Sequence, residues 1–246
     1  MELRKAKQTL REDMASLKRS YTKTTLLDLS AKIMDRLEET DLFQQASCIA
    51  LYHAIPGEVQ TAGLIEKWYR KKRLLLPLIK GNDLQLLLYA GKESLKTGVF
   101  GILEPSEDCE AVPESEIDLI IVPGVAFDRQ HNRLGRGKGF YDRLLSTLDV
   151  PKIGICYDFQ LKDQIPAEPF DRKMDLIITE KRNIVIQILS VCNSSMTLAS
   201  ALALISGVML SLHDFQDKSH HSYIVSKADH RKKTFRYQVE RQNKIA

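Results

Sequence analysis

Six short apolar runs, each about the length of a β-strand, punctuate the first three quarters of this chain and constrain its fold more than any other feature. They cover residues 48–52, 74–78, 84–89, 118–122, 152–156 and 175–179. Most are apolar on consecutive positions rather than on alternating ones. That pattern is typical of strands whose sheet is covered by helices on both faces.

Segments with helical periodicity separate these runs. Residues 2–20 and 24–40 place apolar side chains at helical spacing on charged backgrounds, and residues 61–72 and 140–148 are further helical candidates. Strands that alternate with helices indicate a three-layer α/β fold, in which helices flank a mainly parallel sheet. In such sheets ligands bind beyond the carboxyl ends of the strands, so we expect functional residues just after the apolar runs.

The chain changes character after residue 185. Residues 1–185 contain 28 Lys+Arg and 28 Asp+Glu, whereas residues 186–246 contain 8 and 4, so the net charge of +4 lies entirely in the C-terminal stretch. Residues 183–212 carry no charge, but their many small polar side chains argue against a membrane span, which needs about 20 apolar residues. We predict one globular domain over residues 1–185 and an atypical extension over residues 186–246, made of a helix and a disordered tail.

The cysteines and the N-terminus indicate a reducing, cytoplasmic environment. The four cysteines, Cys48, Cys109, Cys156 and Cys192, are scattered without disulfide or metal-ligand spacing. The first residues are charged, so no secretory signal peptide is predicted. Because the main body is electrically neutral overall, the basic net charge does not indicate a nucleic-acid partner.

A glycine-rich segment, VPGVAFDRQHNRLGRGKGFYD at residues 122–142, follows one apolar run and leads into a helical candidate. Within it, three glycines alternate with two cations: Gly135, Arg136, Gly137, Lys138 and Gly139. Glycines let the backbone approach a polyphosphate closely, and successive N–H groups can form an anion-binding nest. The helix N-terminus adds a favourable dipole, and the cations add charge-assisted hydrogen bonds. On these residues alone, a phosphate site and a flexible solvated turn are equally good interpretations.

The complete string is more specific than its glycines. PGVAFD at residues 123–128, followed by RLGRGKGFYD at residues 133–142, closely resembles the signature of the 5-formyltetrahydrofolate cyclo-ligases, also called methenyltetrahydrofolate synthetases. The resemblance covers about three quarters of the chain and ends near residue 185. Other segments match the same family in the same order.

Two of these segments lie nearer the N-terminus. Residues 7–11, KQTLR, resemble the family's KxxLR element, which reaches the nucleotide phosphates. Residues 52–59, YHAIPGEV, resemble the loop that holds folate. There Glu58 matches the family's substrate-binding glutamate, and His53 matches a neighbouring contact position that is not always histidine.

The third segment, residues 169–175, resembles the family's closing motif, in which Asp171 matches a metal ligand. Phe170 stands where many relatives have histidine. Asp142 ends the glycine-rich segment, where its carboxylate would hold a magnesium ion that bridges phosphate groups. Asp142 and Asp171 are therefore the candidate metal ligands.

The resemblance implies a NagB/RpiA/CoA-transferase-like fold and an ATP-dependent conversion of 5-formyltetrahydrofolate into 5,10-methenyltetrahydrofolate, ADP and phosphate, with Mg²⁺ as cofactor. It assigns catalytic roles to Arg136 and Lys138. The implied ATP-binding residues are Lys7, Gln8, Thr9, Leu10, Arg11, Arg133, Leu134, Gly135, Arg136, Gly137, Lys138, Gly139, Phe140 and Tyr141. The implied substrate-binding residues are Arg11, His53, Glu58, Arg136, Gly137, Lys138, Gly139 and Phe140.

Two other functions stay open on the sequence. A sugar-phosphate isomerase or CoA-transferase-like enzyme of the same fold class would use the glycine-rich segment for a substrate phosphate, without ATP. An RNA-binding module would use RLGRGKGFYD as an Arg/Gly segment with aromatics. The main interpretation is a monomeric cytoplasmic ligase whose partners are small molecules, with neither nucleic acid nor a membrane. Because Glu58 follows a different strand from the glycine-rich segment, we expect folate and nucleotide binding to be separable by mutation.

Overall fold

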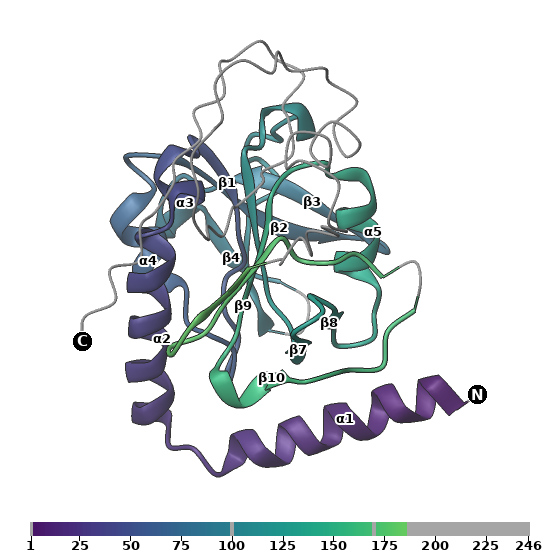
Figure 1. Ribbon diagram of the computed structural model, residues 1–246. Helices are drawn as coiled ribbons and strands as arrows, with labels where there is room; N and C mark the ends of the chain where they lie inside the picture. The colour runs from purple at the N-terminus through teal and green to yellow at the C-terminus, as the bar shows by residue number, and fades with distance from the viewer. Residues whose placement is uncertain (1, 99–100, 169–170, 186–246) are drawn as a thin grey trace, which may run out of the picture. The chain divides into compact units, whose positions relative to one another are not determined.

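A seven-stranded sheet is the centre of the computed structural model, which describes residues 2–98, 101–168 and 171–185 (Figure 1). Its strand order is β12-β11-β9-β6-β1-β2-β3. The five middle strands run parallel: β11 (Leu176–Ile178), β9 (Lys152–Ile155), β6 (Leu119–Val122), β1 (Cys48–Ala50) and β2 (Arg73–Lys80). The two edge strands are antiparallel: β12 (Asn183–Val185) and β3 (Asp83–Leu88). The predicted mainly parallel α/β sheet is confirmed.

Two hydrophobic cores form, one on each face of the sheet. The helices that cover these faces are α2 (Lys23–Glu38), α3 (Asp41–Gln45), α4 (Ala62–Trp68) and α5 (Phe140–Thr147). Ile49 and Ile121 share one core with α2, α3 and α4, while Ala50 and Ile120 share the other with α5. Neighbouring residues of β1 and β6 therefore point into different cores, which explains why these strands are apolar at consecutive positions.

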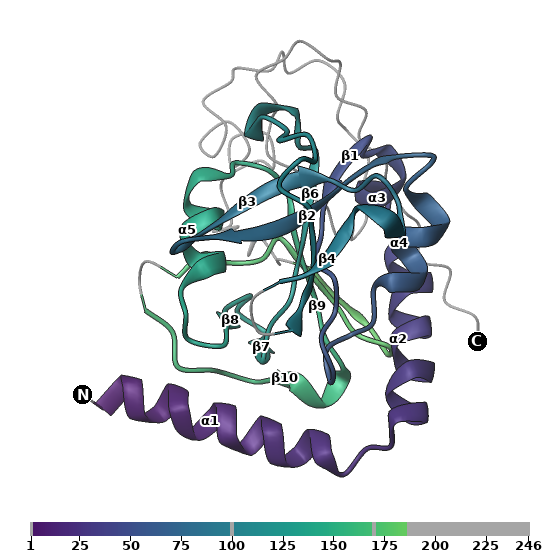
Figure 2. The same cartoon turned by 180° about the vertical axis from the view of Figure 1, so that it is seen from behind.

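The first helix, α1 (Glu2–Arg19), belongs to neither layer. Figures 1 and 2 show it crossing the end of the domain near the short strands β7 (Ala126–Asp128), β8 (Arg133–Leu134) and β10 (Leu161–Lys162). Its one buried residue, Met14, joins a third, small core. Because this core is small, polar contacts must also hold α1 against the domain.

Local signals account for several helix boundaries. The hydroxyl of Thr22 accepts a hydrogen bond from the Thr25 backbone N–H at 3.1 Å and caps the start of α2. The hydroxyl of Thr40 caps α3 in the same way, through the N–H of Phe43 at 3.3 Å. These caps satisfy backbone donors that have no partner within their own helix.

All six predicted strands and all four predicted helices are present, with boundaries shifted by a few residues. The sequence missed α3 and the shortest elements, namely η1 (Lys92–Ser94), β4 (Leu95–Thr97), β5 (Leu103–Pro105), η3 (Glu114–Glu116), β7, β8, η4 (Asp158–Gln160), β10 and β12. Elements of two to five residues are too short to show a hydrophobic period. In the described ranges no helix is long and apolar enough to cross a membrane. The predicted extension over residues 186–246 lies outside those ranges, and the NagB/RpiA/CoA-transferase-like label stays a prediction.

Candidate active site

A cleft lies where the segments after β1 and β6 meet the glycine-rich segment. The two walls from the strand ends are formed by Tyr52, His53, Ile55, Glu58, Pro123 and Gly124. The glycine-rich wall is formed by Arg133, Gly135, Arg136, Gly137, Lys138, Gly139, Phe140, Tyr141 and Asp142. An apolar wall comes from the β2–β3 hairpin, with Pro77, Ile79 and Leu84. This is the position expected for a ligand site in an open, mainly parallel sheet.

The glycine-rich loop, residues 135–139, leads from β8 into α5. Gly137 and Gly139 have φ angles of 93° and 73°, in the left-handed region that favours glycine. A guanidinium group lies against each glycine, so that an added Cβ would be 2.8 Å from Arg133 at Gly135, 3.3 Å from Arg11 at Gly137 and 2.7 Å from Arg143 at Gly139. The three glycines therefore let three arginines approach the backbone closely. Arg133 and Arg143 are also paired with Asp142 and Asp83, whereas Arg11 forms no ion pair within the described ranges and supplies positive charge that favours a bound anion.

Arg11 and Arg143 anchor this loop to other parts of the domain. Arg11 reaches from α1 and donates its Nε–H to the carbonyl of Gly135 at 2.9 Å. Arg143 donates to the Asp83 carboxylate at 2.9 Å and to the Asn82 carbonyl, so it ties the start of α5 to the β2–β3 hairpin. The sequence pointed to Arg11 but missed Arg143, because a cation in an exposed helical turn has no distinguishing pattern.

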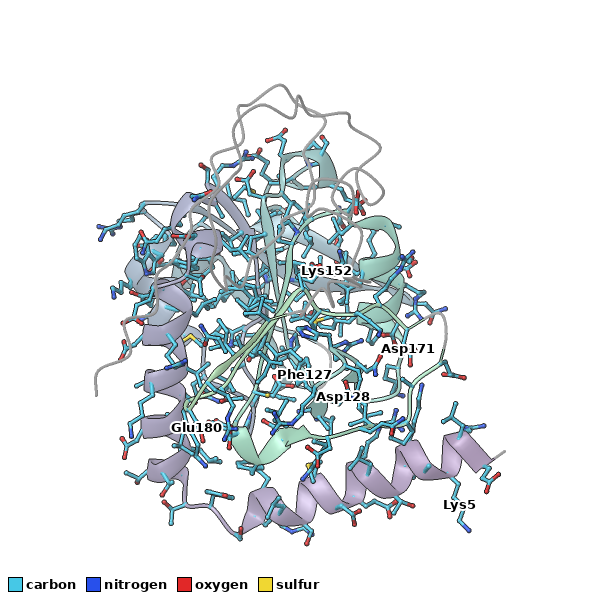
Figure 3. All side chains as sticks on the ribbon, viewed as in Figure 1. Lys5, Phe127, Asp128, Lys152, Asp171 and Glu180 are labelled. Atoms are coloured by element: carbon cyan, nitrogen blue, oxygen red, sulfur yellow. The ribbon has the colours of Figure 1, made fainter. Side chains whose placement is uncertain are left out.

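Lys7, at the other end of the KQTLR segment, is held by two carboxylates. Its Nζ lies 2.6 Å from Glu168 Oε2 and 3.0 Å from Asp171 Oδ2. Burial alone would lower the pKa of the Lys7 ammonium, but the hydrogen bonds to these two carboxylates raise it. Figure 3 shows Asp171 above the N-terminal half of α1. Lys7 thus connects α1 to the segment after β10, and Phe170 of the closing motif lies outside the described residues.

The remaining residues of KQTLR do not share this position. Gln8 and Thr9 are exposed, and the Gln8 side chain bonds to Glu12 within the helix at 2.7 Å. Leu10 is half-buried and packs against the small core around Met14. The structure therefore brings Arg11 to the glycine-rich loop but leaves Gln8 and Thr9 facing solvent.

Glu58 and the glycine-rich loop are in direct contact. Arg136 donates from Nε and from a terminal guanidinium nitrogen to Glu58 Oε1, at 3.0 and 2.9 Å. The other carboxylate oxygen of Glu58 accepts the backbone N–H of Ile55 at 3.3 Å. The two segments follow different strands, but those strands, β1 and β6, are neighbours in the sheet, which brings Glu58 into contact with Arg136. That folate and nucleotide binding are separable by mutation stays a prediction.

The segment that carries Glu58, residues 55–60 (the Glu58 loop), is held by buried groups that the sequence did not reveal. Tyr157, fully buried after β9, donates its hydroxyl to the Glu58 carbonyl at 3.0 Å and lies 3.0 Å from the Ser30 hydroxyl. Ser30 in turn accepts the backbone N–H of Gln60 at 3.0 Å. Tyr157 and Ser30 are separated by 127 residues in the sequence, so no local pattern could have identified them.

Two further buried side chains support the base of the glycine-rich loop. The Asp128 carboxylate, with no exposed surface, accepts the backbone N–H groups of Gln130, Asn132 and Ile165, at 2.9 to 3.0 Å. His131, in a left-handed conformation with φ of 68°, contacts the Met174 carbonyl through Nδ1 at 3.0 Å. Burial lowers the pKa of His131, so the imidazole is neutral near pH 7. Both residues lie inside the segment singled out from the sequence, but as structural supports.

The candidate metal ligands are each paired with a cation. Asp142 Oδ1 lies 2.5 Å from a terminal nitrogen of Arg133, whose side chain is 4% exposed, and Asp171 is bound to Lys7. Among the described residues, no group of three or more His, Cys, Asp or Glu side chains is arranged to hold a metal ion. One oxygen of each carboxylate, Asp142 Oδ2 and Asp171 Oδ1, makes no hydrogen bond within the described ranges. These two oxygens fit the preference of Mg²⁺ for carboxylate ligands.

The remaining predicted residues divide between the cleft and its support. Lys138 is exposed at the tip of the loop, and Phe140 and Tyr141 line the cleft. Leu134 is buried in the small core under α1 instead. His53 lines the cleft, and burial lowers its pKa although Glu66 opposes the change.

The fold and the site together place this chain among the α/β proteins whose ligand site lies at the carboxyl ends of parallel strands. The domain is an open α/β sheet with an arginine-surrounded glycine loop at the carboxyl ends of its parallel strands, an arrangement suited to a phosphate-bearing ligand beside a second, partly apolar one.

Comparison with known proteins gives the family. The family model described as the 5-formyltetrahydrofolate cyclo-ligase family matches residues 3–180, and the chain belongs to this family. A 5-formyltetrahydrofolate cyclo-ligase of Haemophilus influenzae is 37% identical over 137 residues, which span 52% of this chain and 73% of that protein. Another from Escherichia coli K12 is 34% identical over 145 residues, which span 56% of this chain and 80% of that protein. The resemblance identified in the sequence is confirmed.

Two solved structures support the same family assignment. The 5,10-methenyltetrahydrofolate synthetase of Aquifex aeolicus has a TM-score of 0.68 at 35% identity, covering 74% of this chain and 93% of that one. The corresponding synthetase of Mycoplasma pneumoniae has a TM-score of 0.58 at 27% identity, covering 71% of this chain and 98% of that one. The similarity thus extends through the fold that positions the cleft.

Proposed function

We propose that this protein converts 5-formyltetrahydrofolate and ATP into 5,10-methenyltetrahydrofolate, ADP and phosphate. The observation that carries the proposal is the contact between Glu58 and Arg136. It joins the segment that resembles a folate loop to the segment that resembles a nucleotide loop, within a single cleft. Membership of the cyclo-ligase family supports the same reaction.

The chemistry has two steps. The formyl oxygen attacks the terminal phosphorus of ATP, and the bond from that phosphorus to the bridging oxygen breaks, its electron pair leaving with ADP. N10 of the substrate then attacks the formyl carbon; the carbon–oxygen bond breaks, its electron pair leaves with phosphate, and the N10 proton passes to phosphate or solvent. Neither step needs a protein nucleophile, so positioning and charge neutralisation are the main tasks of the protein.

The residues of the cleft divide these tasks. Arg136 and Lys138 would neutralise charge on the transferring phosphoryl group, and Arg11 orients the loop through the Gly135 carbonyl. Glu58 would accept hydrogen bonds from the pterin and would thereby place N5 and N10. Phosphate groups would compete with Glu58 for Arg136, so ligand binding exchanges one partner of that arginine for another.

Magnesium is proposed as the cofactor, held by Asp142 and Asp171. When bound, it would supply positive charge that neutralises the phosphates. Asp142 would keep its hydrogen bond to Arg133 through Oδ1 and offer Oδ2. The buried guanidinium of Arg133 would then orient the carboxylate, as hydrogen bonds to metal ligands commonly do.

The direct test is a spectrophotometric assay of methenyltetrahydrofolate formation from 5-formyltetrahydrofolate. Turnover should require ATP and magnesium together, and excess chelator should abolish it. Product formation without ATP, or in the presence of chelator, would contradict the mechanism. ATP-independent turnover of a sugar phosphate or an acyl-CoA would instead support an isomerase or transferase of the same fold class.

We also propose that residues 1–185 contain the whole activity and that the protein acts as a cytoplasmic monomer. Every residue assigned above lies before Ile186, and β12 already forms the edge of the sheet. A shortened chain that ends at Val185 should therefore stay soluble and keep its specific activity and melting temperature. Loss of most activity on shortening would show that residues 186–246 belong to the functional unit. The proposed monomeric state is tested by measuring the mass of the full chain by sedimentation.

A further inference from the structure

The face of α1 that is turned toward the domain carries Lys7 and Arg11, which belong to the KQTLR segment, and one further cation, Lys18. Five of its residues are buried or half-buried, namely Lys7, Leu10, Arg11, Met14 and Lys18, and they are spaced by 3, 1, 3 and 4 residues. This spacing keeps them on one side of a helix. Figure 3 shows Lys5, by contrast, pointing away from the domain. Lys18 therefore faces the same way as Arg11, which reaches the glycine-rich loop.

Lys18 lies directly over the Glu58 loop. A Cβ added at Gly57 would be 2.7 Å from Lys18 Cδ and 3.4 Å from Lys18 Nζ. The glycine thus leaves room for the lysine stem to cross the backbone next to Glu58. In the described ranges, the Lys18 ammonium makes no hydrogen bond or ion pair, although its side chain is half-buried.

The charges around Lys18 leave an excess of one positive charge. Its charged neighbours are Arg136 and Glu58, and both oxygens of Glu58 are already engaged, by Arg136 and by the N–H of Ile55. Burial and the charge of Arg136 lower the pKa of Lys18, while Glu58 opposes this change. A partly desolvated ammonium next to a second cation gains stability from an anionic ligand.

We propose that Lys18 binds the terminal phosphoryl group of the nucleotide and follows it to the formyl oxygen. This inference rests on the proposed function, and it adds a residue to the site. Lys18 sits where the Glu58 loop meets Arg136, which is where the proposed reaction moves the phosphoryl group from ADP to the substrate. The ammonium exchanges no proton in this step; it neutralises charge while the bond to the bridging oxygen breaks and the bond to the formyl oxygen forms.

The test uses Lys18→Met, which keeps an unbranched stem over Gly57 but removes the charge, and Lys18→Arg, which restores a charge. Lys5→Met is the matched control on the outer face of α1. Lys18→Met should lower kcat roughly 10- to 150-fold, the cost of one charge-assisted hydrogen bond, with little change in the KM for 5-formyltetrahydrofolate. Lys18→Arg should recover part of this loss, and Lys5→Met should behave as the unaltered protein.

A second measurement does not depend on turnover. Calorimetric binding of inorganic tripolyphosphate should weaken at least about fivefold in Lys18→Met and stay unchanged in Lys5→Met. Lys18-dependent tripolyphosphate binding without turnover of 5-formyltetrahydrofolate would support this inference and refute the proposed function. The inference is overturned if Lys18→Met matches Lys5→Met within twofold in both measurements, or if Lys18→Arg loses as much as Lys18→Met. A higher KM for the folate alone would also overturn it, because Lys18 would then bind a substrate carboxylate.

Discussion

The two loops that meet in the cleft are held in different ways. The Glu58 loop is tied by hydrogen bonds to buried groups, above all the hydroxyl of Tyr157. The glycine-rich loop is exposed from Arg136 to Lys138, and it is held from outside by the guanidinium groups of Arg11 and Arg143. The tip of the glycine-rich loop is thus held by cationic side chains, whereas the Glu58 loop is held by buried hydroxyl groups.

This difference suits the two ligands. A pterin is recognised by a few directional hydrogen bonds, which require a carboxylate already in place. A polyphosphate carries several charges that change position during the reaction, and long cationic side chains can follow them. Changes in the Glu58 loop should therefore act mainly on substrate KM, and changes in the glycine-rich loop mainly on kcat.

The largest effect is expected at the tip of the glycine-rich loop. On the proposed mechanism, Arg136→Ala and Lys138→Ala would each remove one contact with the transferring phosphoryl group. Losing about 2–4 kcal/mol of transition-state stabilisation lowers kcat roughly 30- to 1000-fold. Because both side chains are exposed, the melting temperature should hardly change. Near-normal turnover by either variant would remove that residue from the mechanism.

Glu58→Gln tests the contact between the loops. It should weaken binding of 5-formyltetrahydrofolate roughly 10- to 150-fold, because a charged hydrogen-bond acceptor is lost. Nucleotide binding should improve by up to about fivefold, since Arg136 no longer has to leave an ion pair worth up to about 1 kcal/mol. Calorimetry with each ligand separates the two effects. Equal losses for both ligands would indicate a folding defect instead.

Tyr157→Phe tests the support of the Glu58 loop. The variant keeps the ring but loses the hydroxyl that bonds to the Glu58 carbonyl and contacts Ser30. A net loss of about 1 kcal/mol in loop positioning should raise the KM for 5-formyltetrahydrofolate roughly fivefold and leave nucleotide affinity unchanged. Tyr21→Phe is the control, because Tyr21 stacks on Phe159 at the edge of the same aromatic group. A nucleotide defect as large as the folate defect would contradict separate support of the loops.

The smallest effect concerns the base of the glycine-rich loop and depends on pH. Burial lowers the pKa of His131 below its ordinary 6.5, so between the lowered value and 6.5 the unfolded chain binds more protons. The contribution of neutral His131 to the free energy of unfolding is therefore complete above pH 6.5, and it is lost as the pH falls from 6.5 through the lowered pKa. His131→Asn removes this titration, and asparagine tolerates the φ of 68°. Its free energy of unfolding should fall less steeply below pH 6.5; parallel pH profiles for the two proteins would refute the role of His131.

The sequence by itself determined the layered α/β fold and singled out the glycine-rich segment that lines the cleft. The six apolar runs and four helical segments are local patterns, and each was found where the pattern placed it. The glycine-rich segment is also local, since its alternation of Gly and cation lies within five residues. Side-chain periodicity and backbone permissiveness act over a few residues, so they can be read without knowing the tertiary structure.

Only the tertiary structure decided which distant residues meet. Strand order makes β1 and β6 neighbours, and this brings Glu58 within 2.9 Å of Arg136, 78 residues away. The same packing lays α1 along the site and directs Lys18 onto Gly57. Such contacts follow from the minimum free energy of the whole domain, in which strand order and helix placement are set by burial on both sheet faces. No local pattern around Lys18 or Glu58 contains that information.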